Sequence, residues 1–318
     1  MIEYKSKYGL IKGITGGKYY PSGQLKECLL EEYNQINIDL GTFVPKYEIY
    51  DTRTKYRNAL SFYESGELKS IFLEQQQEII SSLGELKVEL ITFYESGSIH
   101  RVFPLYGQIS GYWSEEEELA LAQPITIDLH SIKFDCKVSC FCFYPSGQLK
   151  SLTFCKDEKI TVETNYGKIK VHLGISFYED GKIKSLEPFN PVKITSSIGT
   201  YYAYDNAPFG IHGDNNSLCF TNEGVVQSFT SSLSGIEIKG QGIEEIITPT
   251  LVPSQIDLDE MEVAPIKFEF KKNKVMITDV NQVKHEYEID KYQFSNVTPQ
   301  IDMTKVCSGK CSGCNQCG

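Results

Sequence analysis

The feature that most constrains the fold is a short motif that recurs six times along the chain. Each copy places an aromatic pair before two turn-forming residues and a glycine, and then alternates apolar and polar residues. The copies read YYPSGQLKEC from Tyr19, FYESGELKSI from Phe62, FYESGSIHRV from Phe93, FYPSGQLKSL from Phe143, FYEDGKIKSL from Phe177 and, in degraded form, FTNEGVVQSF from Phe220. Such recurrence predicts a stacked repeat fold, in which each unit buries one face against its neighbours.

One copy of the motif predicts a β-hairpin. The aromatic pair ends a strand, and Pro or Glu followed by Ser or Asp suits the central positions of a type I turn. The glycine stands where the chain needs a positive φ, which gives a hairpin connection with a bulge. The Leu-Lys-Ser-Leu pattern then alternates between the two faces of a return strand.

A second kind of turn separates the copies. SSLGELKVEL from Ser81 and TNYGKIKVHL from Thr164 match in the same register, and their glycines, Gly84 and Gly167, follow a motif glycine at nearly the same interval. The repeating unit is therefore a pair of hairpins, with one turn at each edge of a running meander. We expect an all-β fold built as a repeated β-hairpin meander.

The motif [FY]Y-x-x-G-x-[LI]-K-S resembles the variant class of MORN (membrane occupation and recognition nexus) repeats over roughly residues 15–230. The resemblance implies hairpins strung into an elongated, curved sheet. It also implies an interaction or scaffolding role and carries over no catalytic residues. The chain departs from the family pattern because it lacks the regular second glycine after each return strand, and because its spacers are longer and uneven.

One helix is expected in the meander. The segment YWSEEEELALA at Tyr112–Ala122 has Ser114 as an N-cap, Glu117 at the capping-box position and acidic residues in the first turn. We interpret Glu115 to Glu118 as the solvated start of this helix rather than as a carboxylate cluster.

We divide the chain into four parts. These are a MORN-like repeat domain at residues 1–247, a proline-rich and acidic linker at 248–265, a C-terminal β cap at 266–305 and a cysteine-rich tail at 306–318. The cap prediction depends on the strict alternation around Lys-Asn-Lys in IKFEFKKNKVMITD, which is typical of a hairpin. We expect this hairpin to pack on the end of the repeat sheet.

Charge and hydropathy limit the kinds of partner that we expect the protein to bind. The net charge of −11 argues against nucleic acid, which would be repelled, and disfavours an anionic membrane surface for the same reason. No stretch approaches the roughly 20 apolar residues of a spanning helix, and the N-terminal residues lack the apolar run of a signal peptide. We expect a cytoplasmic protein that binds a protein partner, and the oligomeric state is left open.

The last residues carry four closely spaced thiols, Cys307, Cys311, Cys314 and Cys317, in the pattern C-x3-C-x2-C-x2-C. Short Gly and Ser spacers let a backbone wrap around one centre, and two-residue spacing commonly places neighbouring thiolate ligands. Zinc sites usually draw two separated pairs, whereas a contiguous run is more typical of an iron–sulfur cluster. We predict a metal site, with a [4Fe–4S] cluster favoured and zinc as the alternative. A disulfide or redox tail and a tail with no specific role are the other interpretations.

Cys140, Cys142 and Cys219 are candidates for extra ligands. Cys142 and Cys219 stand directly before the first aromatic of a copy, where other copies carry Ser or Thr, and Cys140 shares this face by strand parity. The simpler interpretation is a small residue on a half-covered face. The sharper one is that this face supplies a ligand or a redox partner to the tail. Cys28 aligns with apolar positions of other copies and is predicted to be in the core.

Other chemistry has little support in the sequence. His212, Asp214, Asn215 and Asn216 form a polar cluster that suits a metal or a substrate but is more typical of a turn. We find no glycine-rich phosphate loop after a strand, no nucleophile elbow and no Cys–His signature, so catalysis is left open and a non-enzymatic role is favoured.

Three functions fit these observations. The first is an interaction or scaffold protein that carries a thiolate metal site. The second is a [4Fe–4S] electron-transfer or redox accessory protein. The third is a protein whose cysteine tail is the substrate of a modifying enzyme.

Overall fold

The computed structural model describes residues 2–48, 52–54, 57–129, 132–208, 213–254 and 261–301. These residues form two compact units. Unit 1 runs to Ile160 and takes in Leu173–Lys182 and residues 213–214, and unit 2 holds the remaining described residues.

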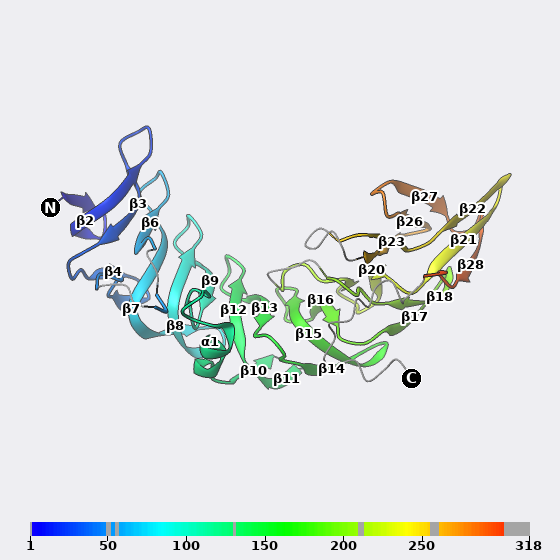
Figure 1. Ribbon diagram of the computed structural model, residues 1–318, viewed down its shortest axis with the longest axis horizontal. Coiled ribbons are helices and arrows are strands. Elements are labelled where there is room, and N and C mark those ends of the chain that lie inside the picture. The colour runs from blue at the N-terminus through cyan, green and yellow to red at the C-terminus, as the bar shows by residue number, and fades with distance from the viewer. Residues whose placement is uncertain are drawn as a thin grey trace. The chain divides into compact units, whose positions relative to one another are not determined.

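Unit 1 is built on an antiparallel meander. Its strands are β1 (Ile2–Ser6), β2 (Gly9–Tyr19), β3 (Leu25–Leu30), β6 (Leu60–Phe62), β7 (Leu68–Ser81), β8 (Gly84–Phe93), β9 (Ile99–Phe103), β12 (Val138–Phe143), β13 (Leu149–Phe154) and the last residues of β15 (Gly167–Phe177). They pair in the order β1–β2–β3–β6–β7–β8–β9–β12–β13–β15. Their hairpin loops follow one another along one edge of the sheet (Figure 1).

Three shorter elements are inserted between the main strands of unit 1. They are a ribbon of β4 (Ile36–Ile38) with β5 (Gly41–Phe43), a ribbon of β10 (Ile125–Leu129) with β11 (Ile132–Cys136), and the helix α1 (Glu115–Leu121). In α1, Glu117 N donates to Ser114 Oγ at 3.1 Å, and Ser114 N donates to the Glu117 carboxylate at 2.7 Å. The predicted capping box is therefore confirmed.

Unit 2 contains a second antiparallel meander. Its strands are β14 (Ile160–Thr164), the first residues of β15, β16 (Ile183–Pro188), β17 (Val192–Ser196), β18 (Gly199–Ala203), β19 (Leu218–Phe220), β20 (Val226–Ser231), β21 (Gly235–Gly240), β22 (Ile243–Ile247), β23 (Thr250–Pro253), β24 (Met261–Ala264), β25 (Ile266–Lys271), β26 (Lys274–Thr278), β27 (Lys284–Glu288) and β28 (Gln293–Val297). The meander pairs as β16–β19–β20–β25–β26–β27, beside a β22–β21–β28 sheet and the ribbons β17–β18 and β23–β24.

The all-β prediction is confirmed, and so is the C-terminal hairpin. Strands β25 and β26 pair around Lys272, and β25 pairs with β20, the return strand of the last motif copy. The stretch interpreted as a linker nevertheless contains β23 and β24, which pair from Thr250 with Ala264 to Pro253 with Met261. Prolines are typical of a linker, but proline is also tolerated in edge strands, and Pro253 is the last residue of β23. The four-part domain division stays a prediction.

The six motif copies share one turn geometry. In the second copy Gly66 N donates to Tyr63 O at 2.9 Å, and Tyr63 N donates to Glu67 O at 2.8 Å. Gly66 has a φ of +84°, and the other five motif glycines have φ between +76° and +89°, where an L side chain is strained. The strand register shifts between Ser61 and Phe62, so the predicted type I turn with a bulge is confirmed.

The core of each unit is built from the same positions of the motif. The first aromatic is buried in every copy after the first: Phe62, Phe93, Phe143, Phe177 and Phe220. In the first copy Tyr19 takes this place and is exposed. Cys28 is fully buried, as its alignment with apolar residues predicts. Burying one such aromatic side chain contributes roughly 1.5–3 kcal/mol, so the repeated phenylalanines account for much of the cohesion within each sheet.

Candidate functional site

The repeat turns of unit 1 are tied to one another by tyrosine hydroxyls. The second aromatic of each copy donates its hydroxyl to the main-chain carbonyl of the first aromatic in the next copy. These bonds are Tyr20 to Phe62 at 3.0 Å, Tyr63 to Phe93 at 2.8 Å, Tyr94 to Phe143 at 2.9 Å and Tyr144 to Phe177 at 2.9 Å. The spacing between neighbouring turns is thereby fixed by four equivalent bonds.

A second set of contacts joins the tips of the same turns. Serine in one turn donates to glutamate in the next: Ser22 to Glu64 at 2.8 Å, Ser65 to Glu95 at 2.7 Å and Ser146 to Glu179 at 2.7 Å. The series is interrupted where Pro145 stands in place of glutamate. Ser96 there shares a hydrogen bond with Ser98 in its own turn at 2.8 Å. The tips at Gly97 and Gly147 are therefore joined less tightly than the others.

A groove lies between two rows of turns in unit 1. One row consists of the repeat turns, and the other of the second turns at Leu40 and at residues 80–82. A cavity of about 530 Å³ lies between the turns at Gly97 and Gly147 and is floored in part by Phe143. A neighbouring cavity of about 250 Å³ reaches Phe93. The two cavities share Asp39, Leu40, Ser96 and Gly97, so the groove is continuous.

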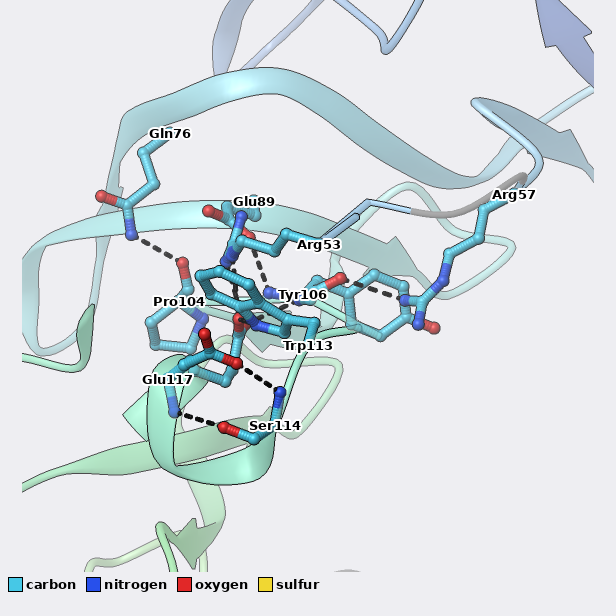
Figure 2. Close-up of polar contacts among 11 residues, drawn as sticks. Arg53, Arg57, Gln76, Glu89, Pro104, Tyr106, Trp113, Ser114 and Glu117 are labelled. Carbon is cyan, nitrogen blue, oxygen red and sulfur yellow. Dashed lines mark hydrogen bonds and ion pairs between the residues drawn. The ribbon is translucent and has the colours of Figure 1, made fainter. Parts of the chain in front are cut away.

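The inserted helix is anchored by a buried ion-pair network that sequence reasoning missed. Arg53 Nε donates to Glu118 Oε2 and Arg53 Nη2 to Glu89 Oε2, both at 2.8 Å (Figure 2). Glu118 also accepts from Trp113 Nε1 at 2.8 Å and from Gly107 N at 2.7 Å. The interpretation of Glu115 to Glu118 as a solvated helix start is therefore wrong for Glu118, whose side chain is only 15% exposed.

Electrostatics keeps this network charged. Burial alone would raise the pKa of Glu118, but hydrogen bonds from Arg53, Gly107 and Trp113 outweigh it and hold the pKa below its ordinary value. Nearby, Arg57 donates to Tyr106 O at 3.1 Å and its guanidinium lies 4.1 Å from the centre of the Tyr106 ring (Figure 2). Each oxygen of the Glu118 carboxylate accepts two hydrogen bonds, so the arrangement stabilises the insertion.

A second polar cluster covers the thiols of β12. Asp214 accepts hydrogen bonds from Arg101 and Ser151, and Arg101 Nη1 lies 3.7 Å from Cys140 Sγ. Burial would raise the pKa of Asp214, but the bonds from Ser151 and Arg101 lower it below its usual value. Cys140 and Cys142 are buried beneath these groups. The half-covered face predicted for Cys142 is therefore wrong, because its side chain is fully buried.

Glycines allow that loop to approach the sheet closely. A Cβ on Gly213 would lie 1.9 Å from Leu152 O, and a Cβ on Gly174 would lie 2.4 Å from Gly213 Cα. Gly213 N donates to Thr153 Oγ1 at 2.8 Å. The two glycines thus permit a main-chain contact that positions Asp214 above β13.

In unit 2, Asn216 of the predicted polar cluster and the neighbouring Ser217 also make structural contacts. Asn216 Nδ2 donates to Ser185 Oγ at 2.8 Å, and Ser217 N donates to Glu187 Oε2 at 2.8 Å. Burial raises the pKa of Glu187 to about 7 even though Ser217 donates two hydrogen bonds to it. These contacts favour the turn interpretation of this cluster for Asp214 and Asn216. His212 lies outside the described residues.

The structure describes only some of the predicted metal ligands. The tail residues Cys307, Cys311, Cys314 and Cys317 lie outside the described residues, so that prediction stays untested. Among the residues that the structure describes, no group of three or more His, Cys, Asp or Glu side chains is placed to hold a metal ion.

The described thiols are poor ligands in their present surroundings. Burial raises the pKa of Cys140 to about 12, and it also raises the pKa of Cys142 and of Cys219. Buried thiols of this kind stay protonated at neutral pH and are typically inert. A role for Cys140, Cys142 and Cys219 as extra ligands to the tail remains a prediction.

Comparison with known proteins adds one match. Residues 173–190 match the family model of the MORN repeat variant, and this segment spans the fifth motif copy. The chain has no significant match among curated proteins or solved structures. In the described part of the chain, no helix is long and apolar enough to cross a membrane. The chain therefore contains a MORN-variant repeat at residues 173–190, and its other five motif copies fold into the same hairpin turn.

Proposed function

We propose that the chain is a non-enzymatic interaction protein that binds a protein partner along the groove of unit 1. The observation that carries the proposal is the continuity of this groove between two rows of turns. Its larger cavity, at about 530 Å³, is in the size range of ligand-binding pockets. The tyrosine bonds between neighbouring repeats hold one wall in place, so a partner would meet a largely pre-formed surface and lose little affinity to ordering it.

The thiol chemistry of the described residues supports a non-enzymatic role. Six cysteines are described, and burial raises the pKa of every one of them. A nucleophilic cysteine needs the opposite shift, because the thiolate is the reactive form. These thiols are therefore suited to packing.

Site-specific photo-crosslinking tests the groove. We would place a photoreactive amino acid at Ser82, Ser96 or Gln148 in the groove, and at Tyr112 or Lys133 as exposed controls, and irradiate cells that produce the full chain. We expect the same protein to be captured at all three groove positions and at neither control. Equal capture at groove and control positions, or no capture at the groove, would refute this function.

For the tail we propose a thiolate metal site at Cys307, Cys311, Cys314 and Cys317. The contiguous spacing favours a [4Fe–4S] cluster, which would allow a role in electron transfer or as a redox accessory protein, and zinc is the alternative. The third candidate is that the tail is the substrate of a modifying enzyme.

Metal analysis of anaerobically purified protein separates these candidates. Brown protein with broad visible absorption and about one site per chain identifies a cluster, since a site of four thiolates holds one centre. Colourless protein with bound zinc identifies a structural site. Metal-free protein with reactive tail thiols excludes both metals and leaves the substrate role. Truncation after Lys305 serves as a companion, because we expect the repeats to fold without the tail.

A further inference from the structure

Three repeat turns in the described structure receive a tyrosine from elsewhere in the chain. The tyrosine binds at the same point each time: the main-chain N–H of the second residue after the motif glycine donates to the tyrosine hydroxyl. The pairs are Leu25 N to Tyr4 at 3.3 Å, Leu68 N to Tyr8 at 2.9 Å and Val226 N to Tyr166 at 3.1 Å. Tyrosine docking is thus a recurring property of this hairpin in both units.

The ring and the hydroxyl proton of the docked tyrosine also have fixed partners. The Tyr8 ring stacks on Phe62 with centroids 6.4 Å apart, and the Tyr166 ring lies 6.2 Å from Phe220. The hydroxyl of Tyr8 donates to Glu67 Oε2 at 3.1 Å. Tyr4 donates in the same way to the residue directly after its glycine, Gln24, at 2.5 Å. At the Gly66 turn the receptor therefore has three parts: the aromatic floor Phe62, the N–H donor Leu68 and the carboxylate acceptor Glu67.

The turn at Gly147 has all three parts and lacks the tyrosine. Phe143 is the floor, Leu149 carries the N–H, and Gln148 offers the acceptor directly after the glycine. The second turn that approaches Phe143 carries Leu83 where Tyr8 and Tyr166 stand in theirs. Leucine has no hydroxyl, and within the described part of the chain no side chain forms a hydrogen bond with Leu149 N or with the Gln148 amide.

A cavity opens beside the Gly147 turn. The cavity of about 530 Å³ is lined by Phe143, Gly147 and Gln148 on one side and by residues 80–82 on the other. It also coincides with the break in the serine–glutamate contacts at Pro145, and the bond from the Tyr94 hydroxyl to Phe143 O still joins the two turns there. An entering side chain would meet no serine–glutamate bond at this opening.

We propose that the Gly147 turn is a receptor for a tyrosine side chain presented by a partner protein. This inference depends on the proposed function, because it names the chemistry that the groove recognises. The ring packs on Phe143, the phenol oxygen accepts from Leu149 N, and the phenol proton goes to Gln148 Oε1. Residues 302–318 do not supply the occupant, since they contain no aromatic residue.

Small probes test the receptor directly on the full chain. Amide chemical shifts would be followed by NMR during titration with N-acetyl-tyrosinamide and, as the matched control, N-acetyl-phenylalaninamide. We expect saturable shifts at Leu149 and Phe143, with the phenylalanine analogue at least about tenfold weaker because one buried hydrogen-bond pair is missing. Equal binding of the two compounds, or no saturable shift with either, would overturn the receptor.

Two variants complete the test. Leu83→Tyr supplies the tyrosine from within the chain, so this variant should no longer bind N-acetyl-tyrosinamide. Gln148→Ala removes only the acceptor of the phenol proton and should weaken the binding of N-acetyl-tyrosinamide about fivefold. The second variant lies on an exposed turn and keeps the experiment decisive even if Leu83→Tyr does not fold. Unchanged affinity in Gln148→Ala would contradict the assigned geometry.

Selection of random displayed peptides on the immobilised full chain separates this inference from the broader one. Tyrosine-bearing peptides that bind the wild type and not Leu83→Tyr support both the tyrosine receptor and the interaction function. Groove-dependent peptides without tyrosine would overturn the receptor and leave the interaction function standing. Absence of groove-dependent peptides, together with absence of cross-links, would overturn both. If the protein alone forms dimers that Leu83→Tyr abolishes, the occupant is a second copy and the separate partner is excluded.

Discussion

The repeat turns and the segments inserted between them are held by different kinds of contact. Neighbouring turns are joined by bonds from tyrosine hydroxyls to main-chain carbonyls and by exposed serine–glutamate bonds. The insertions are held by contacts to buried carboxyl groups, such as Arg53 with Glu118 in unit 1 and Ser217 with Glu187 in unit 2. Stability in the turns is therefore spread over many weak contacts, whereas each insertion depends on a few strong ones.

The largest effect is expected from Glu118→Ala, which removes the central contact of one insertion. It leaves the Arg53 guanidinium, the Trp113 indole and Gly107 N without their shared acceptor, and loss of one partner in a buried ion pair typically costs about 3–5 kcal/mol. We expect a loss of this size in urea unfolding of unit 1. Glu116→Ala, on the exposed face of the same helix, should change stability by less than about 0.5 kcal/mol. Equal effects of the two would contradict a local anchor.

The next effect is a pH dependence in unit 2. Burial raises the pKa of Glu187 from 4.5 to about 7, so the folded state binds a proton that the unfolded state has released. The stabilisation is complete below about pH 4.5 and is lost as pH rises through about 7, with a total near 3 kcal/mol. Glu187→Gln should remove this part of the pH dependence of urea unfolding. A slope that persists in the variant would assign it to another group.

Removing one link between turns should cost much less. Tyr63→Phe deletes the hydroxyl that donates to Phe93 O, and a single hydrogen bond contributes about 1 kcal/mol. Tyr112→Phe is the matched control, because Tyr112 is 79% exposed. Thermal unfolding of both variants checks the prediction. A loss above about 2 kcal/mol would show that the turns are not independent weak links.

The smallest effect is expected at the tips. A double-mutant cycle of Ser146→Ala and Glu179→Ala isolates the exposed bond between them, for which we expect a coupling below about 0.5 kcal/mol. Urea unfolding of the four proteins gives the coupling. A value above about 1 kcal/mol would remove the distinction between turn contacts and insertion contacts.

The same distinction explains what the sequence predicts. The turn geometry, the bulge at Phe62 and the helix cap at Ser114 follow from local residue order, and all three are confirmed. Arg53, a partner of Glu118, lies in a distant segment outside the motif copies, and Arg101, a partner of Asp214, stands in the third copy where the other copies carry Ser or Glu. Neither pairing therefore follows from the repeat pattern. The tyrosine sites lie between these extremes. Tyr8 and Tyr166 stand in matching turns, S-K-Y-G and T-N-Y-G, but the hairpin that each tyrosine reaches is defined only by the fold.

The direction of the tyrosine bonds has a consequence for how such an array grows. Each copy supplies its own donor and takes from its successor only a carbonyl, a group that every residue possesses. A duplicated or exchanged hairpin would find its acceptor already in place, whatever side chains the following copy carried. Repeats of this design can be added, lost or shuffled without matched substitutions on both sides of the junction, so the length of the array can change faster in evolution than its contacts.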